Sequence, residues 1–470
     1  MSYKLQKNRI AFTCILSLNA CNTKLIACRF LHYKPTSMRL ILTLFLFLFL
    51  SLFAVAQVDT LKTRYVVDSP QTQGINSKIF DTLSRIADSA IKAHAFPGCQ
   101  VLIARNGKVI YYKSFGYKNY DKLEPVTPNT LYDLASVTKV SATTMAVMRL
   151  WEEKKLDLAA TLGTYLPWVK GSDKENLRIE DVLLHQAGLV AFIPFYKETI
   201  DTATGQPLPG IYKTIRDDTF SVRIADNMYM RRDWTDTIYK RILLSKLGPR
   251  GKYIYSDNDF IFLGKIVEQL SGETLDKYVA KQFYKPLDMR TTMYRPKENF
   301  TMLSSIAPTE KEKVFRLQLL RGDVHDPGAA MFGGVAGHAG LFSNAYDLAK
   351  LYMMLLNGGD WNGKHYFDKE AINFFTGYHS DNSRRGYGFD KPERDNATNG
   401  DPYPSLYASP QTFGHTGFTG TCVWADPKEN LLFIFLSNRV CPDGGENGLL
   451  SKLSVRRNML DAVYRAIEKK

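Results

Sequence analysis

Residues 131–150 read LYDLASVTKVSATTMAVMRL, and this stretch decides the fold assignment. It contains Ser136 and Lys139 in the spacing Ser-x-x-Lys, followed by a nearly unbroken small and apolar segment over residues 140–150 that predicts a buried helix. The spacing places a hydroxyl and an amine one turn apart on one helix face, where the amine can assist deprotonation of the hydroxyl. The start of such a helix also offers backbone N–H donors to a nucleophile and its oxyanion, although an ordinary N-cap serine fits the same pattern.

A second Ser-x-x-Lys, from Ser89 to Lys92, has a plainer explanation. Apolar residues recur at helical spacing through residues 75–95 and stop before Pro97-Gly98, which predicts an amphipathic helix. Ser89 falls inside that helix, where a polar residue on the solvated face needs no chemical role. We therefore take Ser136 as the candidate nucleophile.

Strand-like apolar runs occur near both ends of the chain, at residues 100–104, 109–112, 421–424 and 431–436. The first pair is joined across Asn106-Gly107, a strong hairpin signal, and the second pair across Asp426-Pro427. Helical spacing over residues 455–467 predicts a C-terminal helix. The expected fold class is α/β (α+β): one antiparallel sheet built from both termini and flanked by helices, with a mostly helical inserted subdomain.

Two middle stretches, residues 190–250 and 365–412, are rich in Gly, Pro, Asp and aromatic residues without clean periodicity. We predict that they form long surface loops around a cleft, where specificity often lies.

Two further motifs accompany Ser136 and Lys139. Tyr255-Ser256-Asp257 supplies a phenol that could carry a proton, and residues 413–417, Phe-Gly-His-Thr-Gly, supply a strand edge beside small residues. With these motifs the chain resembles the serine hydrolases of the class C β-lactamase and penicillin-binding-protein superfamily, in which S-x-x-K carries the nucleophile, Y-x-N the tyrosine base and K-T-G or H-x-G a strand lining the site. Residues 183–189 (LLHQAGL) and 333–343 (GGVAGHAGLFS) look like other segments of that family, so the resemblance extends over residues 75–469.

A narrower resemblance rests on residues 322–326 (GDVHD), 415–420 (HTGFTG) and 437–440 (SNRV). These segments look like the serine-hydrolase modules associated with N-acetylglucosaminidases and like related amidases that cut muropeptides. The resemblance implies a β-lactamase/transpeptidase-like fold, acyl transfer through an acyl-enzyme, and a small peptide, muropeptide or ester as substrate.

The resemblance also assigns roles to individual residues. The catalytic set is Ser136, Lys139 and Tyr255, and the backbone N–H groups of Ser136 and Phe418 are expected to hold the oxyanion. The residues expected to bind the substrate or line the oxyanion site are Asp257, His415, Thr416, Gly417, Phe418 and Arg439.

Two departures from the family pattern affect the substrate. Asp257 stands where asparagine is usual, which replaces an amide by an acceptor-only carboxylate and argues against β-lactam hydrolysis. His415 replaces the lysine of K-T-G, so the charge there depends on pH, and Arg439 is a candidate to bind a substrate carboxylate instead. The activities left open are D-Ala carboxypeptidase, muropeptide amidase, small-ester hydrolase and β-lactamase, besides a non-catalytic relative that binds cell-wall fragments or penicillin.

The start of the chain has the layout of a secretory signal. Residues 40–56 read LILTLFLFLFLSLFAVA, preceded by Met38-Arg39 and ending in a small-residue exit. We interpret residues 1–37 as an upstream extension, 38–56 as a signal peptide or membrane anchor, 57–74 as a linker and 75–470 as the hydrolase domain. The protein is accordingly expected to be exported, to the periplasm or the extracellular space, with membrane attachment through residues 40–56 as the alternative to cleavage.

Composition excludes several other classes. The chain has 470 residues with a net charge of +14, but seven basic residues and no acid fall in residues 1–56, and no basic stripe interleaved with aromatics points to nucleic acid. Six cysteines, three of them in that front segment, are too sparse for a disulfide framework. No metal-ligand spacing and no phosphate-binding glycine loop are present, so we expect neither a metal nor another cofactor.

Overall fold

The computed structural model describes residues 67–298 and 303–468. The expected upstream extension, the apolar run at residues 40–56 and the first part of the expected linker lie outside the described residues. Within the described ranges, no helix is long and apolar enough to cross a membrane.

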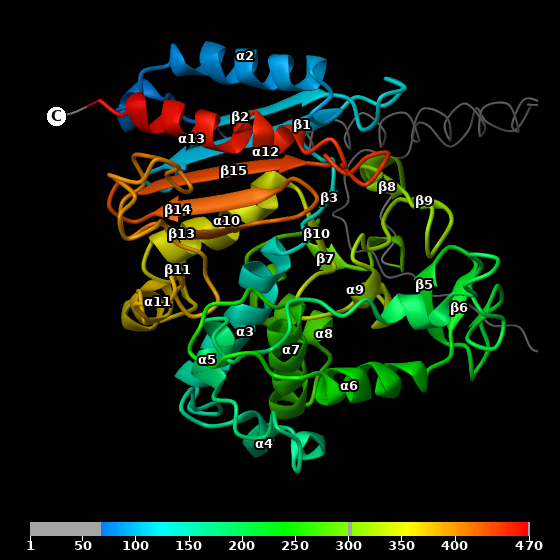
Figure 1. The fold of residues 1–470 in the computed structure, drawn as a ribbon. Helices are drawn as coiled ribbons and strands as arrows, with labels where there is room; N and C mark the ends of the chain where they lie inside the picture. The colour runs from blue at the N-terminus through cyan, green and yellow to red at the C-terminus, as the bar shows by residue number, and fades with distance from the viewer. Residues whose placement is uncertain (1–66, 299–302, 469–470) are drawn as a thin grey trace, which may run out of the picture. The chain divides into compact units, whose positions relative to one another are not determined.

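A five-stranded antiparallel sheet, in the order β13-β14-β15-β1-β2, combines the two ends of the described chain (Figure 1). Its strands are β1 (Gly98–Arg105), β2 (Lys108–Gly116), β13 (Phe413–Thr416), β14 (Cys422–Asp426) and β15 (Leu431–Ser437). The two halves join where β1 pairs with β15, in a register that runs from Cys99 opposite Ser437 to Arg105 opposite Leu431. Both predicted hairpins are confirmed, and Asn106 and Gly107 have the positive φ angles, 51° and 71°, that a tight hairpin turn requires.

Both faces of the sheet are covered, because alternate side chains of each strand enter different cores. On one face, Val101, Ile103, Phe433 and Phe435 pack in a core with the helices α2 (Ile79–Lys92) and α13 (Val455–Arg465). On the other face, the neighbouring side chains of β1 and β15 join a larger core that includes α10 (Ala345–Leu356). Figure 1 shows α2 and α13 on one side of the sheet and α10 on the other.

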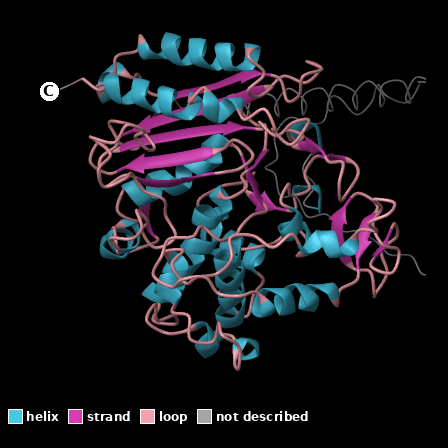
Figure 2. Ribbon diagram, in the orientation of Figure 1, coloured by secondary structure: helices cyan, strands magenta, loops and turns pink. Residues whose placement is uncertain are grey.

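Among the regular elements of the inserted part between β2 and β13, helices predominate, as expected, but turns and loops make up much of it (Figure 2). The predicted buried helix after Ser136 is formed by a π-helical turn, η2 (Lys139–Thr143), continued by α3 (Thr144–Glu152). The other helices of this part are α4 (Leu162–Tyr165), α5 (Ile179–Leu183), α6 (Trp234–Leu244), α7 (Asp257–Ser271), α8 (Leu275–Val279), α9 (Pro327–Met331) and α11 (Lys369–Thr376). Its short strands include β3 (Tyr132–Asp133), β7 (Met293–Tyr294), β8 (Glu310–Lys311), β9 (Leu319–Leu320), β10 (Leu341–Ser343), β11 (Asp360–Trp361) and β12 (Lys364–His365).

The prediction of long loops over residues 190–250 and 365–412 was partly wrong. Residues 190–250 contain a small sheet of β4 (Tyr212–Lys213), β6 (Met228–Met230) and β5 (Val222–Ala225), together with α6, and residues 365–412 contain α11. Strands of two to four residues are too short to show an alternating pattern, so periodicity could not predict them.

The three cysteines in the described part of the chain, Cys99, Cys422 and Cys441, are buried and unpaired. Cys99 and Cys422 lie in the core between the sheet and its outer helices, where they act as small apolar side chains.

Candidate active site

The backbone just before Ser136 is held in a strained conformation. Ala135 has a φ of 46°, in the left-handed region that residues with a side chain rarely adopt. The carboxylate of Asp133, at the end of β3, accepts the N–H of Ala135 at 2.8 Å and the N–H of His325 at 2.6 Å. Asp133 therefore fixes the turn that presents Ser136.

The turn between β13 and β14 docks on the same segment. The hydroxyls of Thr419 and Thr421 donate to the carbonyl oxygens of Asp133 and Leu134, at 2.7 and 2.9 Å. Gly417 lies so close that a Cβ atom would come within 2.4 Å of the Leu134 oxygen. A side chain at position 417 would push the strand edge away from the nucleophile segment.

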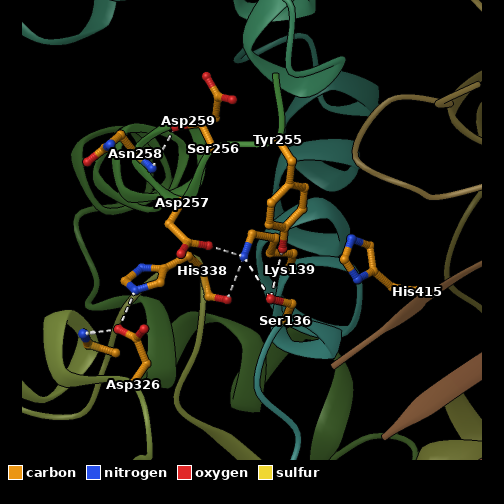
Figure 3. A network of polar contacts seen from close by, with 12 residues as sticks. Ser136, Lys139, Tyr255, Ser256, Asp257, Asn258, Asp259, Asp326, His338 and His415 are labelled. Carbon is orange, nitrogen blue, oxygen red and sulfur yellow. Dashed lines mark hydrogen bonds and ion pairs between the residues drawn. The ribbon is translucent and has the colours of Figure 1, made fainter. Parts of the chain in front are cut away.

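The Ser136 hydroxyl lies between an amine and a phenol (Figure 3). Nζ of Lys139 donates to Oγ of Ser136 at 3.1 Å, and the hydroxyl of Tyr255 donates to the same oxygen at 2.8 Å. Lys139 comes from η2, and Tyr255 precedes α7. The structure thus brings together the three residues that the sequence predicted as the catalytic set.

Lys139 is fully buried, and its Nζ has three hydrogen-bond acceptors. Its Nζ donates to Ser136, to the carbonyl oxygen of His338 at 3.1 Å and to Oδ1 of Asp257 at 2.6 Å. Burial lowers the pKa of Lys139, but the charges of Asp257 and Tyr255 raise it by more, so the pKa ends above its ordinary value of 10.5. Lys139 is therefore an ammonium near neutral pH.

Asp257 takes its position from the first turn of α7. Ser256, the middle residue of the Tyr-Ser-Asp motif, caps this helix, with its Oγ accepting the N–H of Asn258 at 3.1 Å and donating to the carbonyl of Val190 at 2.6 Å. The cap directs Asp257 toward Lys139, as Figure 3 shows. The residue predicted to bind substrate is thus engaged with the lysine of the site.

Tyr255 lies in a buried environment of mixed charge. Burial raises the pKa of its phenol above the ordinary value of 10.0, and the charge of Asp257 adds to this rise. The positive charges of Lys139 and Arg385 offset only part of it. Its ring centre lies 4.7 Å from that of His185 and 5.9 Å from that of His415.

His415 lies on β13 and is almost fully buried. Its Nδ1 is 2.6 Å from the carbonyl oxygen of Thr416, and its Nε2 has no hydrogen-bond partner among the described residues. Burial, together with the charge of Arg385, lowers the pKa of His415 to about 3. Position 415 is therefore uncharged near neutral pH, and the pH-dependent charge expected there is confined to acidic solution.

Phe418 and Arg439 contact each other. The Phe418 side chain is 57% exposed, and the Arg439 guanidinium lies 4.5 Å from its ring centre. Arg439 also donates to the carbonyl of Gly445 at 3.2 Å. In the described part of the chain, the backbone N–H groups of Ser136 and Phe418 have no acceptor, which leaves both available to an oxyanion.

Two histidines of the family-like segments brace loops. His185 has its Nδ1 2.6 Å from Oδ2 of Asp259 and 3.2 Å from the N–H of Ser256. Nε2 of His338 is 2.9 Å from Oδ1 of Asp326, the residue that caps α9. Over the ranges that the structure describes, no group of three or more His, Cys, Asp or Glu side chains is arranged to hold a metal ion.

Sequence reasoning missed four residues of this site: Asp133, Arg385, Thr419 and Thr421. The two threonines alternate along the turn that follows the His-Thr-Gly motif, which is a usable signal for hydroxyls on one side of a strand end. Nothing in the sequence distinguishes Arg385 from its neighbour Arg384.

The β-lactamase family matches residues 83–453 of the chain. The chain belongs to the β-lactamase family. The Ser136, Lys139 and Tyr255 cluster lies within the matched range, and the chain is a serine hydrolase of this family. Curated relatives of this chain carry the name "Putative D-alanyl-D-alanine carboxypeptidase". The protein of Salmonella gallinarum is 33% identical over 426 residues, covering 85% of this chain and 90% of the relative. That of Escherichia coli K12 is 32% identical over 456 residues, covering 90% and 98%.

Solved structures agree on the β-lactamase-family fold. A penicillin-binding-protein homologue from Caulobacter crescentus has a TM-score of 0.59 at 20% identity, covering 84% of this chain and 99% of that one. EstCE1, a hydrolase with promiscuous acyltransferase activity, has a TM-score of 0.57 at 22% identity, covering 82% and 98%. At these identities the likeness concerns the fold alone.

Proposed function

We propose that this chain hydrolyses amide or ester bonds through an acyl-enzyme on Ser136, and that its substrates are cell-wall peptide fragments. The observation that carries the proposal is the position of Ser136 Oγ, within hydrogen-bond distance of both Lys139 Nζ and the Tyr255 hydroxyl. Such a pairing of a nucleophile with proton-handling groups is the requirement for covalent catalysis.

In the proposed acylation, Tyr255 acts as the base in its phenolate form. It takes the Ser136 proton while Oγ bonds to the substrate carbonyl carbon, whose oxygen becomes an oxyanion. The Tyr255 hydroxyl then returns the proton to the leaving nitrogen or oxygen as its bond to carbon breaks. Water attacks the acyl-enzyme by the same sequence of transfers, which frees Ser136.

Lys139 contributes charge rather than a base in this scheme. Its ammonium is held by Asp257, so its charge favours both the phenolate of Tyr255 and the developing alkoxide of Ser136. The N–H groups of Ser136 and Phe418 are the proposed oxyanion donors, each worth about 10²–10³ in rate.

The substrate class rests on the relatives named as carboxypeptidases and on the groups around Phe418. Arg439, beside the exposed ring of Phe418, is the proposed partner of a free substrate carboxylate. Asp257 argues against β-lactam hydrolysis, because its carboxylate cannot donate to an acyl side chain and is already paired with Lys139. The proposed activities are D-Ala carboxypeptidase and muropeptide amidase.

The sequence of the first 56 residues supports export, to the periplasm or the extracellular space. We propose that residues 38–56 are a signal peptide or an anchor, and that the hydrolase domain begins near residue 75.

Mass spectrometry of a muropeptide mixture tests the proposal. The mixture is incubated with the full chain and, separately, with its Ser136→Ala variant. Loss of alanine that depends on Ser136 identifies a carboxypeptidase, and separation of peptide from sugar identifies an amidase. Identical product spectra for the two proteins contradict the proposal and favour the small-ester hydrolase or the non-catalytic binder.

A further inference from the structure

A buried arginine with unused donors lies next to the proposed base. Arg385, in the segment between α11 and β13, is 3% exposed. Its Nη2 donates to the hydroxyl of Tyr253 at 3.2 Å, whereas its Nε and Nη1 have no hydrogen-bond partner among the described residues. Burying a charged group without full pairing costs several kcal/mol, so the placement of this side chain calls for an explanation.

The nearest carboxylate, Asp390, compensates the charge of Arg385 but leaves its Nε and Nη1 without hydrogen bonds. Asp390 Oδ1 lies 3.5 Å from Nε of Arg385, beyond a good hydrogen bond. Asp390 is already engaged by Arg384 Nε and by the hydroxyl of Tyr403, each at 2.7 Å. Asp390 therefore leaves hydrogen-bond donors of Arg385 unused.

Arg385 instead faces the aromatic residue that touches the nucleophile. Its guanidinium carbon lies 5.3 Å from the ring centre of Tyr255, and the hydroxyl of Tyr255 is bonded to Ser136. Position 415, where the K-T-G form of the family pattern carries a lysine, holds a neutral histidine. The strand therefore supplies no cation here, and Arg385 approaches the same phenol from a loop.

Charged and titratable side chains from several elements surround Tyr255. The titratable and charged groups that face it are Lys139 from η2, His185 after α5, Asp257 from α7, Arg385 from the loop before β13 and His415 from β13. Lys139 and Asp257 form an ion pair, and burial keeps both histidines neutral. Arg385 is the second cation of this set beside Lys139, and its own carboxylate partner, Asp390, lies at the longer distance of 3.5 Å.

We propose that Arg385 is the positioning residue that stabilises the phenolate of Tyr255, as a fixed cation that replaces the lysine of the strand motif. This inference rests on the proposed function, in which Tyr255 takes the Ser136 proton. A cation at this distance favours the charged form of the phenol and so increases the fraction of molecules ready to react. The guanidinium stays charged at every pH the enzyme meets, unlike a histidine.

The test uses a fluorophosphonate that labels Ser136, followed by intact mass from about pH 6 to about pH 9, so that no natural substrate is needed. Arg385→Met is expected to slow labelling about tenfold or more and to displace the rise of rate with pH toward higher pH. Arg385→Lys keeps the charge and is expected to restore most of the rate. Arg384→Met, which removes the adjacent arginine bound to the same Asp390, is the matched control and should label like the wild type.

A charge-relocation variant separates electrostatics from structural damage. Arg385→Met combined with His415→Lys moves the cation to the strand and is expected to recover labelling, which a merely structural role for Arg385 would not produce. Thermal unfolding of each variant verifies that it is folded.

Three results overturn the inference. The first is wild-type labelling by folded Arg385→Met, and the second is a folded double variant that labels no faster than Arg385→Met. The third is a wild type that is not labelled at Ser136, which overturns the proposed function and this inference together. In the first two results the wild type is still labelled at Ser136, so a failure of the Arg385 inference can be told apart from a failure of the proposed function.

Discussion

The Nζ atom of Lys139 lies 2.6 Å from Oδ1 of Asp257, so the ammonium beside the nucleophile has a carboxylate partner before any substrate arrives. Asp257→Ala leaves a fully buried ammonium without its charge partner. We expect the free energy of unfolding to fall by about 3 kcal/mol, measured by urea denaturation. Asp257→Asn keeps an oxygen acceptor for Lys139 and should lose less. Equal stability of the alanine variant and the wild type would show that the pair is not formed in solution.

Ser136→Ala removes the proposed nucleophile while leaving the fold intact. Hydrolysis of an activated ester is expected to fall by on the order of 10⁴-fold or more. Ser89→Ala is the control, because Ser89 begins the other Ser-x-x-Lys of the described chain and is exposed on α2. An equal loss in the two variants would rule out Ser136 as the specific nucleophile.

Tyr255→Phe removes only the hydroxyl that touches Ser136. Loss of a general base typically costs about 10²–10⁴ in rate, so a measurable remnant should survive. The ring still packs against His185, and the thermal midpoint should change little. If this variant hydrolyses an activated ester with the kcat/KM of the wild type, Tyr255 is not the general base.

The buried neutral His415 makes the fold sensitive to acid. Its pKa is about 3 in the folded state, against 6.5 for an ordinary imidazole, so the unfolded chain binds more protons between these values and stability is lost as pH falls below 6.5. His415→Gln removes this titration, worth on the order of 5 kcal/mol in full. Urea denaturation at several pH values should show a smaller acid dependence for the variant. Superimposable pH dependences would contradict the burial of a neutral imidazole.

Gly417→Ala tests the close approach of the strand edge to the nucleophile segment. The new methyl group would meet the Leu134 oxygen at 2.4 Å and the Thr421 hydroxyl at 2.2 Å. We expect a stability loss of about 1–3 kcal/mol, together with slower acylation of Ser136. Gly210→Ala is the matched control, since a Cβ there meets nothing within 4 Å. If Gly417→Ala is as stable and as readily acylated as Gly210→Ala, the strand edge does not pack closely against the nucleophile segment.

The sequence predicted those parts of the molecule whose signals are local. A few neighbouring residues were enough to predict the hairpin at Asn106-Gly107, the helix after Ser136 and the Tyr-Ser-Asp motif. The resemblance to a known family then placed the Ser136 and Tyr-Ser-Asp motifs in one site. The helix α6 was missed although Trp234, Ile238 and Ile242 recur at intervals of four, because the Gly- and Pro-rich surroundings obscured that spacing.

Partnerships across long sequence separations could not be predicted. Asp257 was expected to face a substrate, but the cap by Ser256 turns it toward Lys139, and only the fold brings those two residues together. The same holds for Arg385, whose unpaired donors become visible only when its neighbours are known. Burial decides the charge of His415, and burial of one side chain on a strand depends on what packs over it.

The nucleophile segment depends on hydroxyls that arrive much later in the chain. Leu134 and Thr421, which bond to each other, are separated by 287 positions, and the centre of the sheet is completed only when β15 pairs with β1. A ribosome makes the chain from its N-terminus, so Ser136 is synthesised long before the residues that hold it in place. We therefore expect the nascent chain to be inactive until β13 to β15, residues 413–437, have been made. A truncated product that lacks these strands would contain Ser136 without an active site.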